Sequence, residues 1–475
     1  MARTTHHGER GAGFTVVGRV LILAVGSATV IGHSFLASAT VPRRGELTFS
    51  NPAGVHRTVM ATGSLDQDNP FFEELGTNGR SCFTCHRPAQ AWTITPEELR
   101  ERFARTAGQD PIFRTNDGSN CEGGAPASLA ERRRAFSLLL TKGLIRVGLN
   151  VPANAEFDVV DADDPYRCNA PLAAVSMYRR PLPTANLKFL STVMWDGRQT
   201  LAGQSIDDGL VVQAREAVTG HAEGAPPSDA QLRAIVDFEL GVFTAQTHDE
   251  RAGRLSEAEA RGGPRRLIRE PFCIGINDPL GMLPAVPGAC LAPASGFDPV
   301  VFTLFDGWRQ ARSRDRRAIA RGEELFNNRQ FVIADVPGLN GTAGDPVSGP
   351  IQGGTCTICH DTPNAGNHSV SMPLNIGIVE AARRTRDLPL YTLRNRVTGD
   401  LVQVTDPGRA MISGKWRDVG KFKGPVLRAL AARAPYFHDG SAASLAEVLE
   451  FYDTRFGIQL SAQEKADLLA FLRAL

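Results

Sequence analysis

The chain has 475 residues, of which 42% are hydrophobic and 22% charged, so it is long enough for two globular domains and is neither disordered nor collagen-like. Lysine and arginine number 52 against 51 aspartates and glutamates, a balance that excludes the basic surface typical of a nucleic-acid-binding protein. Of the eight cysteines, four form two tight pairs and four stand alone.

The N-terminal segment has the pattern of an export signal. Arg3 and Arg10 precede an apolar run at residues 20–32, which leads to a small-x-small sequence at residues 37–39. This order predicts a signal peptide over residues 1–39 and a periplasmic mature protein. The strictly apolar run is shorter than the ~20 residues of a bilayer span. The alternative, an uncleaved membrane anchor, therefore needs the wider range of residues 14–37, which includes Arg19 and His33.

The four isolated cysteines are candidates for disulfides, which persist in exported proteins. The sequence-local pairing joins Cys121 to Cys168 and Cys273 to Cys290. That pairing is one of the three connectivities that four cysteines allow. Four buried free thiols are the other alternative.

The paired cysteines lie in two copies of one motif. Residues 82–86 read CFTCH and residues 356–360 read CTICH, and both match C-x-x-C-H, the signature of covalent c-type haem attachment. The composition predicts only about 0.003 chance matches. A zinc site would need both pairs in one place, and a thioredoxin-like motif would occur once. The motifs therefore predict two haems, with these thioether anchors and proximal iron ligands: Cys82, Cys85, His86, Cys356, Cys359 and His360.

The predicted elements, in chain order, are mostly helices. TPEE at residues 95–98 predicts a capping box and a helix to about residue 106, and SDAQ at residues 228–231 predicts the start of another. Residues 314–326 predict an amphipathic helix ahead of the second motif. The chain closes with two helices, one with its apolar face at residues 445–452 and the last capped by SAQE at residues 461–464.

Strand signals are few, so the expected fold is mostly α. We expect two cytochrome c-like haem domains, at residues 40–298 and 299–475, with loop-rich insertions. Residues 107–169 are polar, contain glycine and enclose Cys121 and Cys168. They predict a disulfide-held insertion that lies outside the haem core.

These features together resemble the bacterial dihaem cytochrome c peroxidases, including their MauG-like branch. The resemblance rests on both haem motifs, on WDGR at residues 195–198, on GKFKGPVLR at residues 420–428 and on APYFHDG at residues 434–440. It implies an enzyme with two c haems. The N-terminal haem would reduce hydrogen peroxide, and the C-terminal haem would store or relay oxidising equivalents through Trp195, whose alternative is a structural role in the core.

The resemblance also implies an acid–base group over the N-terminal haem, because cleavage of a peroxide needs a group that moves a proton between its two oxygens. Glu216 has the family's spacing from Gly209, although the proline that follows this glycine in the family is absent. Gln204 resembles the neighbouring distal amide. The alternative for Glu216 is a solvated carboxylate on a helix face. His221 is a rival acid–base group, a sixth iron ligand or a surface residue.

Two features depart from many family members. Their N-terminal haem is blocked by a distal histidine, but residues 87–220 contain no histidine. We therefore expect this haem to be five-coordinate or water-bound in the diferric state and to need no reductive activation. At the C-terminal haem, Tyr452 stands where the peroxidases proper have a methionine ligand and MauG-like members a tyrosine. Met372, Met411 and a merely structural Tyr452 are the alternatives.

The family holds a calcium ion between its domains, through backbone oxygens and one asparagine upstream of the tryptophan. The corresponding sequence here, RRPLP at residues 179–183, lacks that asparagine, and the carbonyls of Arg433 and Pro435 are the remaining candidate ligands. The implied partners are hydrogen peroxide and an electron donor, either a small cytochrome c, a cupredoxin or a protein substrate. A homodimer stays open.

Two other functions stay open. A dihaem electron-transfer cytochrome would have both irons six-coordinate and no peroxide site. A MauG-like maturase or an oxygenase would use the same pair of haems on a protein or an organic substrate.

Overall fold

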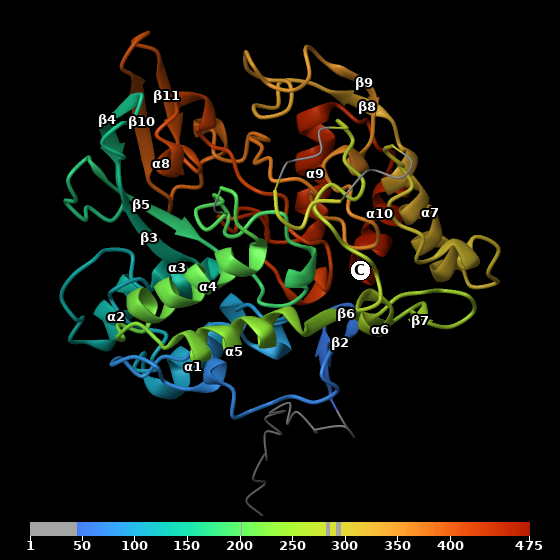
Figure 1. Cartoon of the computed structure of the whole chain (residues 1–475), viewed down its shortest axis with the longest axis horizontal. Coiled ribbons are helices and arrows are strands. Elements are labelled where there is room, and N and C mark those ends of the chain that lie inside the picture. The colour runs from blue at the N-terminus through green and yellow to red at the C-terminus, as the bar shows by residue number, and fades with distance from the viewer. Residues whose placement is uncertain (1–44, 201, 282–285, 291–295) are drawn as a thin grey trace, which may run out of the picture. The chain divides into compact units, whose positions relative to one another are not determined.

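The computed structural model describes residues 45–200, 202–281, 286–290 and 296–475, which belong to one unit of structure (Figure 1). The predicted signal peptide at residues 1–39 lies outside the described residues. Within those ranges, every helix is too short or too polar to cross a membrane.

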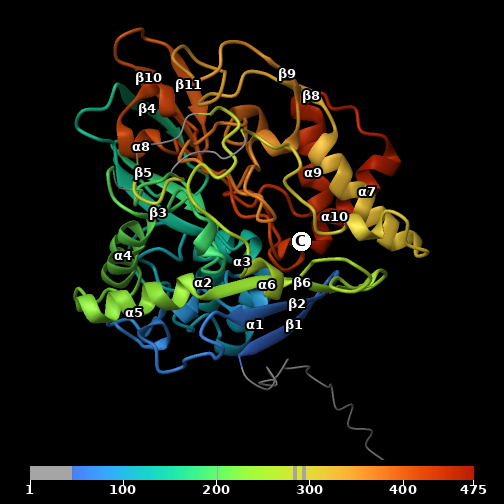
Figure 2. The ribbon, with the colours of Figure 1, turned by 45° about the vertical axis from the view of Figure 1, so that its right-hand side comes forward.

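A four-stranded antiparallel sheet brings the start of the described chain against the segment that follows residue 240. Its order is β1-β2-β6-β7, and its strands are β1 (Glu46–Asn51), β2 (Gly54–Met60), β6 (Val242–Asp249) and β7 (Gly253–Arg254). Every second residue of β2 is buried, which is the pattern of a strand with one face on a core. The short helix α6 (Pro264–Leu267) packs beside β6 (Figure 2).

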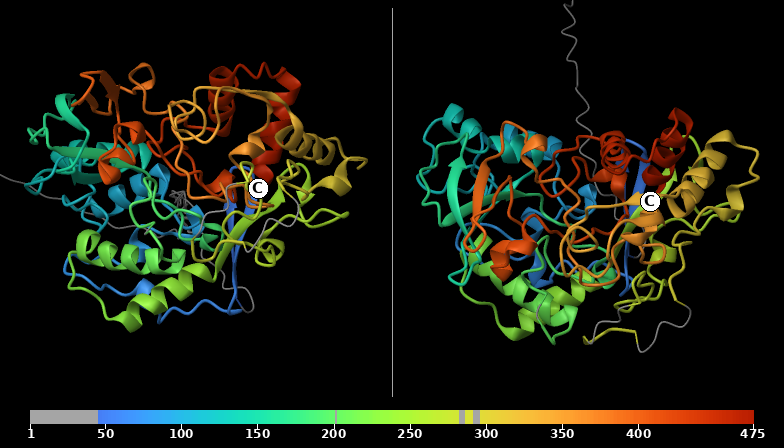
Figure 3. Two further views of the ribbon diagram at one scale, coloured as in Figure 1. Left: turned by 45° about the horizontal axis from the view of Figure 1, so that its top comes forward. Right: turned by 90° about the horizontal axis from the view of Figure 1, so that it is seen from above.

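Three longer helices belong to the same half of the chain: α1 (Pro96–Thr106), α4 (Ile206–Glu216) and α5 (Asp229–Leu240). Figure 3 shows α4 and α5 side by side. The capping box predicted for α5 is confirmed, since the Ser228 hydroxyl accepts from the backbone N–H of Gln231. The box predicted for α1 is wrong. Thr95 precedes that helix but its side chain makes no cap bond, and Pro96 begins the helix through its fixed φ.

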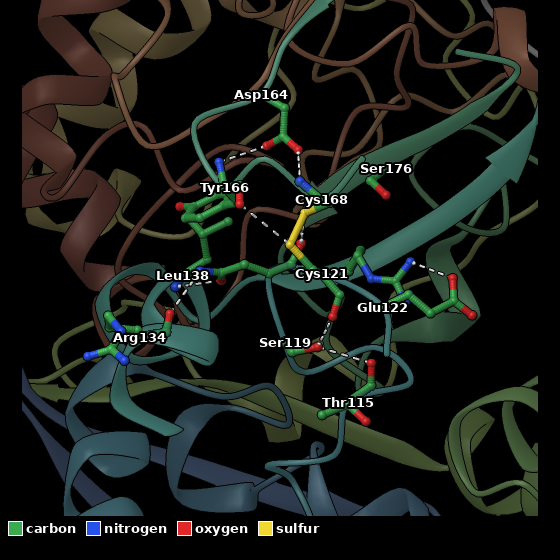
Figure 4. The surroundings of a disulfide bond; sticks show 12 residues. Thr115, Ser119, Cys121, Glu122, Arg134, Leu138, Asp164, Tyr166, Cys168 and Ser176 are labelled. Carbon is green, nitrogen blue, oxygen red and sulfur yellow. Dashed lines mark hydrogen bonds and ion pairs between the residues drawn. A yellow bond between two sulfur atoms is a disulfide. The ribbon is translucent and has the colours of Figure 1, made fainter. Parts of the chain in front are cut away.

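Residues 107–169 contain regular structure of their own: α2 (Leu129–Ala135), α3 (Ser137–Lys142), β3 (Ile145–Asn150) and β4 (Phe157–Asp163). β3 pairs with β5 (Ala174–Arg179), and β4 joins β10 (Leu390–Asn395) and β11 (Leu401–Val404) of the C-terminal half. The predicted disulfide between Cys121 and Cys168 is confirmed and closes this segment (Figure 4). The second predicted disulfide, Cys273 with Cys290, is also confirmed.

The C-terminal half is built on α7 (Arg314–Asn328), α9 (Leu445–Phe456) and α10 (Ala462–Ala474), as the sequence predicts. α7 and α10 approach each other so closely that a Cβ on Gly322 would lie 2.0 Å from the carbonyl oxygen of Asp467. Only glycine fits at this position. The core beneath them is aromatic, with Phe302, Phe305 and Phe471 fully buried. The remaining elements are β8 (Phe331–Ile333), β9 (Ile351–Gly354) and α8 (Ala410–Ser413).

The described residues contain more strand than the sequence predicts, in four small sheets. Two of the strand pairings, β2 with β6 and β4 with β10, join segments far apart in the sequence and give no hairpin signal. The prediction that residues 107–169 lie outside the haem core is wrong in one respect. Ile112, Asp117, Ile145 and Val147 line the cavity of the first haem motif.

Candidate functional site

The first cavity lies beside residues 82–86. A short 3-10 turn at Cys82–Thr84 places Cys82, Cys85 and His86 on the wall of this cavity. The Nδ1 atom of His86 bonds to the Trp92 carbonyl at 3.1 Å, which leaves Nε2 for a metal. Burial lowers the pKa of His86 to about 4, so the imidazole is neutral, the form that binds iron.

The second cavity repeats this arrangement around residues 356–360. The turn Cys356–Ile358 puts Cys356, Cys359 and His360 on its wall. The Nδ1 atom of His360 bonds to the Gly366 carbonyl at 2.7 Å, and burial lowers the pKa of the imidazole. The four motif cysteines are the free thiols of the described chain, as thioether anchors require.

Buried cations beside both cavities also fit a haem. Lys423 and Arg433 line both cavities and Arg428 lines the first. No ion pair between described residues includes any of the three, and nitrogens of both arginines are buried without a hydrogen-bond partner. Burial lowers the pKa of Lys423 to about 7 and those of Arg428 and Arg433 to about 10. A haem carries propionate carboxylates, which would supply the missing counter-charge.

The two cavities share one wall. Trp195 lines both, together with Arg180, Pro181, Leu182, Pro183, Lys423, Pro425 and Arg433. The indole Nε1 of Trp195 donates to the Arg180 carbonyl at 2.8 Å, and its own carbonyl accepts from the backbone N–H of Lys423 at 2.9 Å. The indole is therefore fixed between the two haem motifs.

His221 lies on the wall of the first cavity, at the end of a π-turn (Ala217–His221) that extends α4. Its Nδ1 bonds to the carboxylate of Asp117, which also accepts from Arg80 at 2.6 Å. Burial opposes the ionisation of Asp117, but the bonds and charges of His221 and Arg80 outweigh it and lower the pKa of this carboxyl. Asp117 and Arg80 were not predicted, because Asp117 lies 104 positions before His221 and no local motif joins them.

Glu216 and Gln204 are exposed, and neither lines the first cavity. The residues of α4 and its extension that line it are Leu210, Gln213, Ala214, Ala217, Val218 and His221, which lie along one side of the helix. Glu216 points away from that face, and its carboxylate accepts from the side chain of Gln199. The roles of Glu216 and Gln204 stay predictions.

Glu239 is a buried carboxyl of the first cavity that the sequence did not reveal. It lies near the end of α5 on a face with Ile235, and its Oε2 has no hydrogen-bond partner. Burial raises its pKa to about 8, so the group keeps its proton at neutral pH. A lone glutamate in a helix gives no sequence signal for such a position.

Tyr452 lines the second cavity with His360. The other four tyrosines each donate a hydrogen bond to a backbone carbonyl. The Tyr452 hydroxyl has no such acceptor among the described residues, and burial raises its pKa. Met372 and Met411 do not line this cavity. Met411 is buried in another cluster, beside Phe157 and Leu393.

The candidate calcium ligands lie near the shared wall. Pro435 lines the second cavity. The Arg433 carbonyl accepts a hydrogen bond from Arg180 at 3.2 Å. The described part of the chain holds no cluster of three or more histidine, cysteine, aspartate or glutamate side chains that could bind a metal ion.

Comparison with known proteins gives matches over part of the chain. No family model matches it. A cytochrome-c peroxidase of Pseudomonas sp. (strain SCT), IdrP1, is 34% identical over 140 residues, which are 25% of this chain and 36% of the relative. The cytochrome c551 peroxidase of Nitrosomonas europaea is 30% identical over 128 residues, which are 26% of this chain and 31% of the relative.

The chain thus spans about a third of the length of the curated relatives that it matches. Among solved structures, a MauG-like protein associated with microbial copper homeostasis is 17% identical and covers 86% of both chains, with a TM-score of 0.40. The sequence matches confirm the resemblance that the motifs indicated: over about a quarter of its length, this chain is similar to bacterial cytochrome c peroxidases.

Proposed function

We propose that the chain is a periplasmic dihaem peroxidase that reduces hydrogen peroxide at the first cavity and exchanges electrons with the second through Trp195. The observation that carries the proposal is the shared wall, in which one indole contacts the cavities of both C-x-x-C-H motifs. A haem bound in each cavity supplies an iron that gives and accepts single electrons. A small cytochrome c or a cupredoxin then returns the electrons.

His221, oriented by Asp117, is the acid–base group that its position supports best. Because Asp117 holds Nδ1, Nε2 is free to take the proton from one peroxide oxygen and to return it to the other as the O–O bond breaks. Each turnover consumes two electrons and two protons and forms two waters. Arg80 keeps Asp117 ionised, so the imidazole keeps its orientation throughout.

Tyr452 is the proposed second ligand of the C-terminal haem iron. Its support is a phenol that lines the cavity of His360 and has no hydrogen-bond acceptor among the described residues. A phenolate is a hard anionic donor that stabilises oxidised iron. Such a ligand suits a haem that stores oxidising equivalents.

The second candidate is an electron-transfer cytochrome in which His221 ligates the first haem. One observation favours it: the Nδ1 atom of His221 is anchored, as are those of His86 and His360, which leaves Nε2 for iron.

Peroxide added to the diferric holoprotein separates the two functions. A peroxidase should show a high-spin ferric signal in the electron paramagnetic resonance spectrum and an immediate change in its Soret band. It should also oxidise a reduced small cytochrome or cupredoxin. Two low-spin haems that peroxide does not change, before or after one-electron reduction, would exclude the peroxidase and leave the cytochrome.

A further inference from the structure

Arg180 is a buried cation without a carboxylate partner in the described chain. Its side chain and backbone are 5% exposed. Nη1 donates to the carbonyl of Lys142 at 2.8 Å, and Nη2 donates to those of Ile94 at 2.7 Å and Arg433 at 3.2 Å. Its two terminal nitrogens are thus satisfied, unlike the partnerless nitrogens of Arg428 and Arg433.

The three carbonyls come from separate parts of the chain. Ile94 lies just before α1, Lys142 ends α3 and Arg433 lies in the loop that precedes α9. The Arg180 guanidinium therefore donates hydrogen bonds to backbone carbonyl oxygens of both the N-terminal half and the C-terminal half of the chain. Several carbonyl oxygens around one cation are also how proteins hold calcium.

The backbone of Arg180 connects these guanidinium contacts to the wall that the two cavities share. Its N–H donates to the His438 carbonyl at 2.6 Å, and its carbonyl accepts from the Trp195 indole at 2.8 Å. The ring of Trp195 lies edge-on to that of His438, with 6.2 Å between their centroids. A shift of Arg180 would move Trp195 and the His438 loop together.

The residues present do not fit a calcium ion at this junction. The Arg433 carbonyl, one of the two expected ligands, already accepts from a guanidinium. A divalent cation on that oxygen would lie beside the positive charge of Arg180 and be repelled by it. The region also lacks the asparagine of the family's calcium site.

We propose that the guanidinium of Arg180 replaces a metal ion here, so that the chain needs no calcium to join its two halves and to position Trp195. Arg180 is a positioning residue, because it acts through the indole. Its effect on electron transfer rests on the proposed peroxidase function, whereas the replacement of the ion does not.

The wild-type holoprotein gives the first test. We expect less than a stoichiometric amount of calcium by elemental analysis after gel filtration, and the same thermal midpoint in calcium chloride and in the chelator EGTA. One bound calcium per chain, or a midpoint that falls in EGTA, would overturn the proposal. Neither measurement depends on peroxidase activity.

Two variants give the second test. Arg180→Asn removes the cation and adds an amide oxygen, so its thermal midpoint should fall in EGTA and recover in calcium. Arg180→Lys, the matched control, keeps a positive charge and should show no calcium response. An Arg180→Asn protein that is as stable as the wild type in EGTA, or that calcium does not recover, contradicts the proposal.

The rate of electron transfer between the haems, followed by stopped-flow spectroscopy, tests the positioning of Trp195. In Arg180→Asn it should fall at least about tenfold in EGTA and recover in calcium, while the control keeps most of it. An unchanged rate in destabilised Arg180→Asn would overturn the positioning role. A wild type that does not react with peroxide would instead count against the proposed function and leave the calcium tests valid.

Discussion

The two cavities lie beside the same C-x-x-C-H motif but have different surroundings. The first is lined by many charged and titratable side chains, among them His221 and the carboxyl groups of Glu73, Asp117 and Glu239. The second is lined by leucine, isoleucine, valine and phenylalanine and also by His368, His438, Tyr436 and Tyr452, but by no aspartate or glutamate of the described chain. The first cavity therefore presents carboxyl groups that can exchange protons, whereas the described lining of the second presents imidazoles, phenols and cations but no carboxyl group. In the proposed function, peroxide chemistry and the storage of oxidising equivalents are separated in this way.

Removal of one haem at a time should show the largest difference between the two cavities. Cys82→Ala with Cys85→Ala should leave one covalent haem and abolish the optical response to peroxide. Cys356→Ala with Cys359→Ala should also leave one haem but keep that response and lose sustained turnover. Mass spectrometry counts the haems. A peroxide response that survives only in the first variant would reverse the assignment of the two cavities.

The proposed acid–base pair of the first cavity, His221 and Asp117, is the next target. His221→Gln should lower kcat/KM for hydrogen peroxide by about 10²–10⁴-fold, because proton transfer is lost. Asp117→Asn should lower it by about 10–100-fold, because the imidazole loses its orientation. Steady-state assays at saturating donor measure both effects. An equal loss in Glu216→Gln, with His221→Gln unaffected, would make Glu216 the acid–base group.

Tyr452 tests the second cavity. Tyr452→Met replaces a hard anionic donor by a neutral thioether, so the potential of the C-terminal haem should rise by on the order of 0.1 V, within the range that axial ligands span. Spectroelectrochemical titration measures it, with Tyr452→Phe as the control that removes only the oxygen. The same spectrum and potential in both variants would mean that the iron ligand lies elsewhere.

Glu239 should give the smallest effect, a pH dependence of stability. Its pKa is raised to about 8 in the folded protein, whereas the unfolded chain ionises it near the ordinary value. Stability should therefore fall as pH rises from about 5 to 8, by roughly 1–4 kcal/mol from this group. Glu239→Gln cannot ionise and should lose that slope. Thermal midpoints of both holoproteins at the two ends of this range measure it, and parallel slopes would contradict the assignment.

Local patterns predicted the parts of the molecule that local forces determine. The cap at Ser228, the amphipathic helices α7 and α9 and the nearest-neighbour disulfides depend on residues close together in sequence. The pair of His221 with Asp117 could not be predicted, because a contact across 104 positions depends on the whole fold. The direction of the Glu216 side chain could not be predicted, because it depends on which face of α4 lies against the cavity.

The Cys121–Cys168 disulfide would make the proposed acid–base pair, His221 and Asp117, sensitive to the redox state of the surroundings. Asp117 and Cys121 belong to one loop, in which the Ser119 hydroxyl donates to the Thr115 carbonyl at 3.0 Å (Figure 4). The bond to Cys168 fastens this loop to the strands that follow it. A chain kept in a reducing cytoplasm would lack that fastening and hold His221 less firmly. The proposed proton transfer by His221 would therefore become fully effective only after the chain reaches an oxidising compartment.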